Sequence, residues 1–447
     1  MTREERIRFA LSIATDTKEF LMGNGVSEKA PEIFKRFFPG KGALIIADIH
    51  TFPALGKKVL EHFRDSGIQV KTFIIEEEEF HAEWKYVQMV DAQLDQNPGF
   101  VLVSVGSGVI NDLCKLSSHH HGQSYLTLPT AASVDGYSSF GASITFEGAK
   151  QTFSCPAPVA IIADMAVIAR APRAMTAAGY ADLAAKIPAG AEWMISDFVG
   201  TEPIVPDAWC VLQDHLDGFL SRPADVAAGD EDAIADVFEG LTLSGFAMQA
   251  ARSSRPASCC DHLFSHILDM TGHRYKGKLV SHGFQVAVGT LTMCAVFDQL
   301  FKLDLTKLDV DASLAAWPSL EEEQERALVL FRNFPAPKLG YTEITKKYAP
   351  APVVREELTK LRDSWPGFKA KLQGQVYSYE KMHELLKAAG APASPSDIGL
   401  TNQDIKDMFP LVQMMRFRYN VLDLAKRGGF YEKIVLPLFT KGGVYEI

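Results

Sequence analysis

The strongest constraint on the fold of this chain is an alternation, within its first 170 residues, of short apolar runs and segments with helical spacing. The runs that we interpret as buried strands cover residues 43–47, 70–75, 100–105 and 124–128. Between the first two runs, Leu55, Val59 and Phe63 repeat near the 3.6-residue period of a helix. Strands joined by helical crossovers pair in parallel and are covered on both faces. The pattern therefore predicts an α/β domain over residues 1–170.

The rest of the chain, after about Pro172, has a different pattern. Ala- and Leu-rich segments follow one another, and strand-like runs are few, apart from a short candidate near the C-terminus. We expect helices over 173–200, 205–221, 230–252, 257–271, 283–302, 319–334, 352–387 and 402–426. This pattern predicts a mostly helical second domain over residues 171–447, with surface connections at 336–350 and 389–398.

Charge and cysteine content exclude several classes of protein. The chain has 45 Lys and Arg against 55 Asp and Glu, a net charge of −10. Nucleic-acid binding needs clustered positive charge, so we expect no nucleic-acid partner. The six cysteines form no CxxC pair, which favours a reduced, cytoplasmic chain. The first residues lack the apolar core of a signal peptide, and no stretch reaches the ~18 apolar residues of a membrane span.

Two segments at predicted strand ends suggest a nucleotide site. The strand 100–105 ends in Gly106-Ser107-Gly108, and glycines before a helix let the backbone approach a phosphate closely. The full GxGxxG pattern is absent, and a segment like this, taken alone, is more often an ordinary strand–turn–helix junction. The polar segment 128–139 (LPTAASVDGYSS) follows the strand 124–128, although a polar loop with a turn would look the same.

A third set of residues suggests a metal site. His262 and His266 are four residues apart, which places both rings on one face of a helix, and Pro256 suits the first turn of that helix. Asp182 and His282 lie in other helical segments. One carboxylate with imidazoles suits zinc, iron or nickel, and a catalytic site needs three protein ligands. Taken alone, a histidine pair with this spacing more often lies on the surface or in the core without binding a metal. We interpret His119–His121 as a solvated turn.

Together these segments resemble the sn-glycerol-1-phosphate dehydrogenase family, which is related to iron-containing alcohol dehydrogenases, glycerol dehydrogenases and dehydroquinate synthases. The resemblance rests on residues 129–139, 178–186, 254–266, 281–283 and 416–425, which occur in the family's order. It implies a dehydroquinate-synthase-like fold. In that fold, a Rossmann-like, nucleotide-binding parallel-sheet domain is followed by an all-helical domain that binds metal and substrate.

The resemblance also implies a role for each matching residue. The implied metal ligands are Asp182, His262 and His282, and the implied catalytic residues are Asp182, His266 and Asp135. The implied cofactor contacts are Gly106, Ser107, Gly108, Val109, Ile110, Thr130, Ala131, Ala132, Ser133 and Ser139. The cofactors would be NAD or NADP and one divalent ion (zinc, nickel or iron). A homo-oligomer is also expected.

The implied reaction, in phospholipid metabolism, is the reversible reduction of dihydroxyacetone phosphate to sn-glycerol 1-phosphate. The partner is thus a small phosphorylated ketone or polyol, and Arg255 and Lys150 are our candidate phosphate donors. Glu76–Glu79, expected to start a helix, would disfavour a 2′-phosphate and so favour NAD. The alternatives are a metal-dependent dehydrogenase of an unphosphorylated polyol such as glycerol, and a nucleotide-binding module without chemistry. A dehydroquinate-synthase-like lyase is less consistent, because such enzymes usually have Glu where this chain has Asp182.

The sequence also departs from the family pattern. Gly106-Ser107-Gly108 replaces a triple-glycine turn, and Cys259-Cys260-Asp261 stands where Gly, a small residue and Glu are common. We place extra chain length within 305–400. These departures affect the expected substrate more than the expected metal or cofactor.

Overall fold

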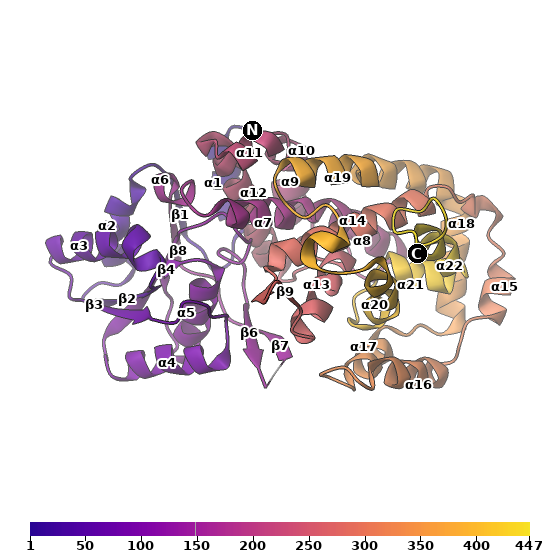
Figure 1. Ribbon diagram of the computed structural model, residues 1–447, viewed down its shortest axis with the longest axis horizontal. Helices are drawn as coiled ribbons and strands as arrows, with labels where there is room; N and C mark the ends of the chain where they lie inside the picture. Colours follow the sequence, from indigo (N-terminus) through magenta and orange to yellow (C-terminus); the bar gives the residue numbers. More distant parts are fainter. Residues whose placement is uncertain (148) are drawn as a thin grey trace. The chain divides into compact units, whose positions relative to one another are not determined.

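The computed structural model describes residues 1–147 and 149–447 (Figure 1). Its contacts divide the chain into two compact units. The first comprises Met1–Leu183, Val205–Pro256 and Ala388–Gly390, and the second comprises Ala184–Ile204, Ala257–Lys387 and Ala391–Ile447. The functional division that we expected, at 170/171, stays a prediction.

A six-stranded parallel sheet forms the centre of the first unit. Its strand order is β1-β8-β5-β4-β2-β3. The strands are β1 (Glu19–Gly23), β2 (Gly42–Asp48), β3 (Val70–Ile75), β4 (Phe100–Gly106), β5 (Leu126–Pro129) and β8 (Ala160–Asp164). The four predicted strands correspond to β2, β3, β4 and β5. Strands β1 and β8 were not predicted, because their five-residue segments show too little periodicity to be recognised on their own.

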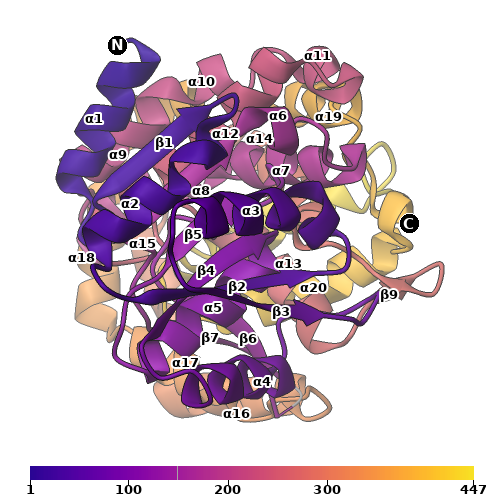
Figure 2. The same ribbon diagram turned by 90° about the vertical axis from the view of Figure 1, so that its left-hand side faces the viewer.

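Helices cover both faces of this sheet, as Figure 2 shows. On one face lie α2 (Ala30–Phe37) and α3 (Lys57–Asp65), the latter preceded by a π-helical turn at Phe52–Gly56. On the other face lie α4 (Trp84–Asp95) and α5 (Gly108–His120). Along β2, Ile45 packs on the face covered by α2 and α3, and Ile46 packs on the face covered by α4 and α5. This is because successive side chains of a strand point to opposite faces of the sheet. The predicted α/β architecture is confirmed.

The remaining elements of the first unit are mostly helical. They are α1 (Arg3–Ile13), the turn Val26–Lys29, the hairpin strands β6 (Ala142–Phe146) and β7 (Ala149–Phe153), α6 (Met165–Ile168), α7 (Arg173–Ala184), α9 (Pro206–Leu212), the turn Gln213–His215, α10 (Leu216–Phe219), α11 (Pro223–Ala228) and α12 (Glu231–Ala251). The buried carboxylate of Glu239 on α12 pairs with Arg3 and Arg6 on α1, so this ion pair holds the start of the chain against α12. The expected helix start at Glu76–Glu79 is wrong, because these residues form an irregular segment before α4.

The second unit is largely helical, as predicted. Its elements are α8 (Lys186–Val199), α13 (Cys260–Met270), β9 (Arg274–Tyr275), β10 (Lys278–Leu279), α14 (His282–Leu300), Leu305–Lys307, α15 (Val310–Ala315), α16 (Leu320–Phe331), α17 (Leu339–Lys347), α18 (Ala351–Gln375), α19 (Tyr379–Ala388), Pro395–Ile398, α20 (Asn402–Met414), α21 (Val421–Arg427), α22 (Tyr431–Val435) and Leu436–Leu438. The expected connection at 336–350 instead contains α17, whose Ile344 is buried. The short strand candidate near the C-terminus is absent from the described residues, where α22 forms instead.

Within the described part of the chain, we find no helix that is both long enough and apolar enough to cross a bilayer.

Candidate functional site

The turn between β4 and α5 lies where open parallel sheets bind ligands. In the sheet, β2 lies between β3 and β4. The chain adds β3 on one side of β2 and then returns to add β4 on the other side, so the order in which strands are added reverses between β2 and β4. Ligands bind at the carboxyl ends of strands at such a reversal. Here Gly106 ends β4 and Gly108 begins α5. The first backbone N–H groups of a helix have no partners within the helix and can donate to a phosphate.

The two glycines of this turn also pack closely against neighbouring side chains. A Cβ atom on Gly106 would lie 2.7 Å from the side chain of Ile110, and one on Gly108 would lie 2.8 Å from Cγ2 of Val134. The N–H of Thr130 donates to the carbonyl of Gly106 at 3.1 Å. The structure therefore brings together the two predicted cofactor segments, 106–110 and 130–139.

Lys115 holds the second of these segments in place. Its buried ammonium donates to the carbonyl oxygens of Gly136 (2.9 Å), Ser139 (2.8 Å) and Gly141 (2.9 Å). Burial raises the pKa of the Asp112 carboxyl, against the opposing effect of the Lys115 ammonium 3.6 Å away. Sequence reasoning missed this role of Lys115. The sequence signal that could have revealed this role is that Lys115 occupies an apolar position of a helix, because lysine is almost never fully buried without partners.

Close helix contacts place Asp135 beside Asp182. A Cβ on Gly179 of α7 would lie 2.0 Å from the carbonyl oxygen of Ala132, so only glycine permits this approach. The N–H of Asp135 donates to Oδ2 of the fully buried Asp182 at 3.1 Å. The hydroxyl of Ser244 donates to Oδ2 of Asp135 at 2.9 Å. Residues 178–186 thus supply the carboxylate of Asp182. Through Gly179 they also supply the close approach to Ala132 that brings the N–H of Asp135 to this carboxylate.

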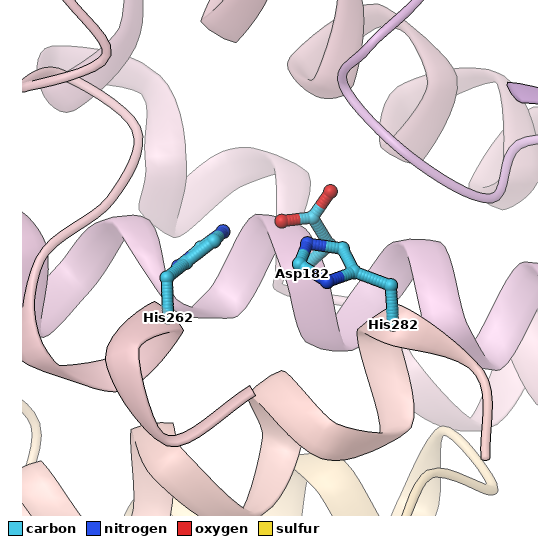
Figure 3. A group of neighbouring side chains, drawn as sticks. All are labelled: Asp182, His262 and His282. Atoms are coloured by element: carbon cyan, nitrogen blue, oxygen red, sulfur yellow. The ribbon is translucent and has the colours of Figure 1, made fainter. Parts of the chain in front are cut away.

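Asp182, His262 and His282 form a group that we call the aspartate–histidine cluster. One ligand atom from each lies within 4.8 Å of the others, and Figure 3 shows the carboxylate and the two rings pointing toward one another. The ring centroids of the two histidines are 5.3 Å apart. Asp182 and His262 are buried, and His282 is half-buried. A carboxylate and two imidazoles suit zinc, iron or nickel, so this donor set fits a catalytic ion with one coordination position left open.

Neighbouring side chains orient both imidazole rings. The carboxylate of Asp261 contacts Nδ1 of His262, and its other oxygen accepts the N–H of Cys259 at 3.2 Å. The hydroxyl of Ser265 donates to Oε1 of Gln285 at 2.7 Å and lies 2.9 Å from Nδ1 of His282. Because that hydroxyl has one proton, Nδ1 of His282 acts as the donor to Ser265. Such partners select the tautomer that presents Nε2 to a metal.

Helix α13 begins at Cys260, three residues later than position 257, where we expected it. The N–H of Cys259 donates to Oδ1 of Asp261 at 3.2 Å, and the N–H of Cys260 donates to Oε2 of Glu192 at 3.0 Å. These carboxylates satisfy the first N–H groups of the helix, so the helix begins where they bind. His262 and His266 still lie within α13, as predicted.

The other candidate residues have varied surroundings. His266 is half-buried and is not in the aspartate–histidine cluster. Arg255 is fully buried, and Lys150 is half-buried on β7. His119 and His120 end α5 and His121 is its C-cap, so only His121 of the three lies in the expected turn; His120 pairs with Asp91 (2.9 Å) and His121 with Asp95 (3.1 Å).

Comparison with known proteins agrees with this architecture. Residues 21–172 match the family model described as iron-containing alcohol dehydrogenase. A glycerol-1-phosphate dehydrogenase [NAD(P)+] from Bacillus velezensis is 32% identical over 284 residues, covering 62% of this chain and 71% of the relative. The enzyme of the same name from Pyrococcus furiosus is 32% identical over 277 residues, covering 62% and 77%. The chain belongs to the glycerol-1-phosphate dehydrogenase family.

Solved structures support the same fold for this family member. A probable glycerol dehydrogenase from Sinorhizobium meliloti has a TM-score of 0.61 at 15% identity, covering 95% of this chain and 98% of that one. Sulfoacetaldehyde reductase from Bifidobacterium kashiwanohense, solved with NAD+, has a TM-score of 0.57 at 14% identity, covering 94% and 98%. At these identities the likeness shows the fold alone.

Proposed function

We propose that this chain catalyses the reversible reduction of dihydroxyacetone phosphate to sn-glycerol 1-phosphate with NADH or NADPH. The observation that carries the proposal is the aspartate–histidine cluster, in which ligand atoms of a carboxylate and two imidazoles lie within 4.8 Å of one another. Membership of the glycerol-1-phosphate dehydrogenase family supports the choice of substrate. The protein would act in the cytoplasm, since none of its six cysteines is in a disulfide among the described residues.

Asp182, His262 and His282 would hold one divalent ion (zinc, nickel or iron). When bound, such an ion supplies Lewis-acid stabilisation of the negative charge that develops on the C2 oxygen of the substrate, worth several kcal/mol. Asp261 and Ser265 keep the two rings in the orientation that the ligand set needs. These two residues are therefore positioning residues.

Asp135 and His266 would act on the substrate. Asp135 is oriented by Ser244 and contacts Asp182 through its N–H, so its carboxylate can hold a substrate hydroxyl. His266, one helical turn after His262, would hold a terminal hydroxyl or transfer the proton of the product alcohol. Hydroxyls held at two points fix the face of C2 that receives the hydride.

The nicotinamide cofactor would bind along 106–110, 130–133 and Ser139. The backbone N–H groups at the start of α5 would donate to its phosphates. Glu76–Glu79, which follow β3 and are exposed, would repel a 2′-phosphate and so favour NAD. We also propose a homo-oligomer, which light scattering of the purified protein would test.

The decisive experiment compares dihydroxyacetone phosphate with dihydroxyacetone, using the same metal, pH and cofactor. Charge-assisted contacts to the phosphate contribute roughly 1.5–3 kcal/mol each. Two such contacts would raise kcat/KM about a hundredfold or more for the phosphorylated ketone. The product should be sn-glycerol 1-phosphate, determined by chiral analysis.

Equal kcat/KM values for the two ketones would contradict this proposal and favour a dehydrogenase of unphosphorylated polyols. Absence of net NADH consumption would favour the lyase alternative. Arg255→Ala and Lys150→Ala test the proposed phosphate donors, because a preference that survives both changes means that other residues bind the phosphate.

A further inference from the structure

A second group of buried ligand atoms lies in the second unit, apart from the residues assigned to catalysis. Glu192, Cys259 and Cys260 each place one ligand atom within 4.8 Å of the other two, and all three side chains are buried. We call this group the cysteine cluster. Glu192 lies on α8, Cys259 is the N-cap of α13, and Cys260 is the first residue of that helix.

The backbone at Cys259 explains why two consecutive thiols reach one carboxylate. Consecutive residues within a helix do not face each other. Cys259 has φ −145° and ψ −132°, which lie outside the helical region, so its side chain does not follow the rotation of α13. Both sulfurs therefore lie near Glu192, although the residues are adjacent in the chain.

Backbone donors from two other segments bind the carboxylate of Glu192. Its Oε2 accepts the N–H of Cys260 at 3.0 Å, and its Oε1 accepts the N–H of Val421 at 3.1 Å. Buried charged groups are normally hydrogen-bonded, ion-paired or bound to a metal.

We propose that Glu192, Cys259 and Cys260 form a second metal site, which takes a thiolate-preferring divalent ion such as zinc. Soft thiolate ligands select ions of this class. Two sulfurs at about 2.3 Å from one tetrahedral ion lie about 3.8 Å apart, and the ligand atoms of the cysteine cluster, all within 4.8 Å of one another, are compatible with that spacing. Binding would release the thiol protons.

With three protein ligands, a tetrahedral ion in this site would take a water as its fourth ligand, and the site would link three helices. It joins α8 to the start of α13 and, through the N–H of Val421, to the start of α21. His262 follows Cys260 by two residues, so an ion in the cysteine cluster would fix the helix turn that carries one member of the aspartate–histidine cluster. The two sites differ in donors, because the cysteine cluster contains sulfur and the other contains only nitrogen and oxygen.

The competing explanation involves no metal. Burial and the neighbouring Cys259 and Glu192 raise the pKa of the Cys260 thiol, so without an ion both thiols could stay protonated and donate to the Glu192 carboxylate. Metal content and a spectroscopic signature of metal–sulfur bonding separate the two explanations.

The experiment loads the full-length protein with cobalt(II). Thiolate bound to cobalt gives a near-ultraviolet charge-transfer band, whereas the aspartate–histidine cluster contains no sulfur and gives none. We expect this band in the wild-type protein, together with two ions per chain by elemental analysis. The variant Cys259→Ser/Cys260→Ser should lose the band and one ion, whereas His262→Ala should keep the band and lose the other ion.

Cys294→Ser is the matched control, since this buried cysteine on α14 lies outside the cysteine cluster, and it should keep both ions and the band. A folded, cobalt-loaded wild type without the band would overturn the proposal even if the double variant does not fold. A band that survives in the double variant would also overturn it. Failure of the proposed function would appear differently, as a protein with the band but without turnover of dihydroxyacetone phosphate.

Discussion

At the scale of single residues, the contact between Asp261 and His262 determines how the imidazole is presented. Asp261→Asn keeps an oxygen to accept the N–H of Cys259 but places an uncharged amide opposite Nδ1 of His262. Loss of such a carboxylate partner typically weakens metal affinity 10–100-fold. We expect a loss of that size, measured by chelator competition, with Asp269→Asn on the same helix as the control. An unchanged affinity would show that Asp261 has only a capping role.

A second prediction at this scale concerns Gly108. Gly108→Ala should weaken NADH binding, measured by calorimetry, because the added Cβ obstructs the close approach of a phosphate to the turn. The same Cβ would also lie 2.8 Å from Cγ2 of Val134. The double variant with Val134→Ala removes that internal clash. NADH affinity that returns to the wild-type value in the double variant would assign the effect to packing rather than to contact with the cofactor.

At the scale of elements, the packing of α13 against α14 depends on Gly289. A Cβ at this position would lie 2.1 Å from the carbonyl oxygen of Asp261, a backbone atom that cannot rotate away. Overpacking of this kind costs about 1–3 kcal/mol. Gly289→Ala should therefore lower the free energy of unfolding in urea and also weaken metal binding, since the two helices carry His262 and His282.

The control for this prediction is Gly367→Ala, in the interior of α18, where an added Cβ meets no atom within 4 Å. Alanine is favoured over glycine in a helix by about 1 kcal/mol, so this variant should be slightly more stable than the wild type. If both variants changed stability in the same direction, close approach at Gly289 would not be the cause.

At the scale of the whole molecule, ligand binding should appear as increased stability. NADH at a hundred times its Kd should raise the free energy of unfolding by about 2.7 kcal/mol. The proposed cofactor contacts share no residue with the aspartate–histidine cluster, so this increase should persist after metal removal with a chelator. Thermal unfolding with and without NADH, in metal-loaded and chelated protein, measures it. Loss of the NADH effect on chelation would mean that cofactor binding requires the ion.

The division into compact units also belongs to this scale. Local periodicity indicated a change of pattern near residue 170, whereas the contacts place α9–α12 in the first unit. One physical cause is the buried carboxylate of Glu239, which pairs with Arg3 and Arg6 more than 230 residues away. No local segment of the sequence indicates such a pairing.

The sequence by itself determined the features that local patterns encode. Alternating apolar runs identified β2 to β5, because buried strands and amphipathic helices differ in period. Short motifs offered four candidate metal ligands, the family resemblance implied the three of the aspartate–histidine cluster, and the structure brings those three together. The metal and cofactor roles of the individual site residues stay predictions.

Only the tertiary structure decided which distant groups meet. It paired β1 with β8, turned the Lys115 ammonium toward three loop carbonyls, and placed Glu192 beside two cysteines. It also moved the start of α13 to Cys260, because a carboxylate 68 residues earlier binds the first N–H of that helix. The physical reason is common to all of these cases. Burial makes each polar group require a partner, and the partner can come from any part of the chain that the fold brings near.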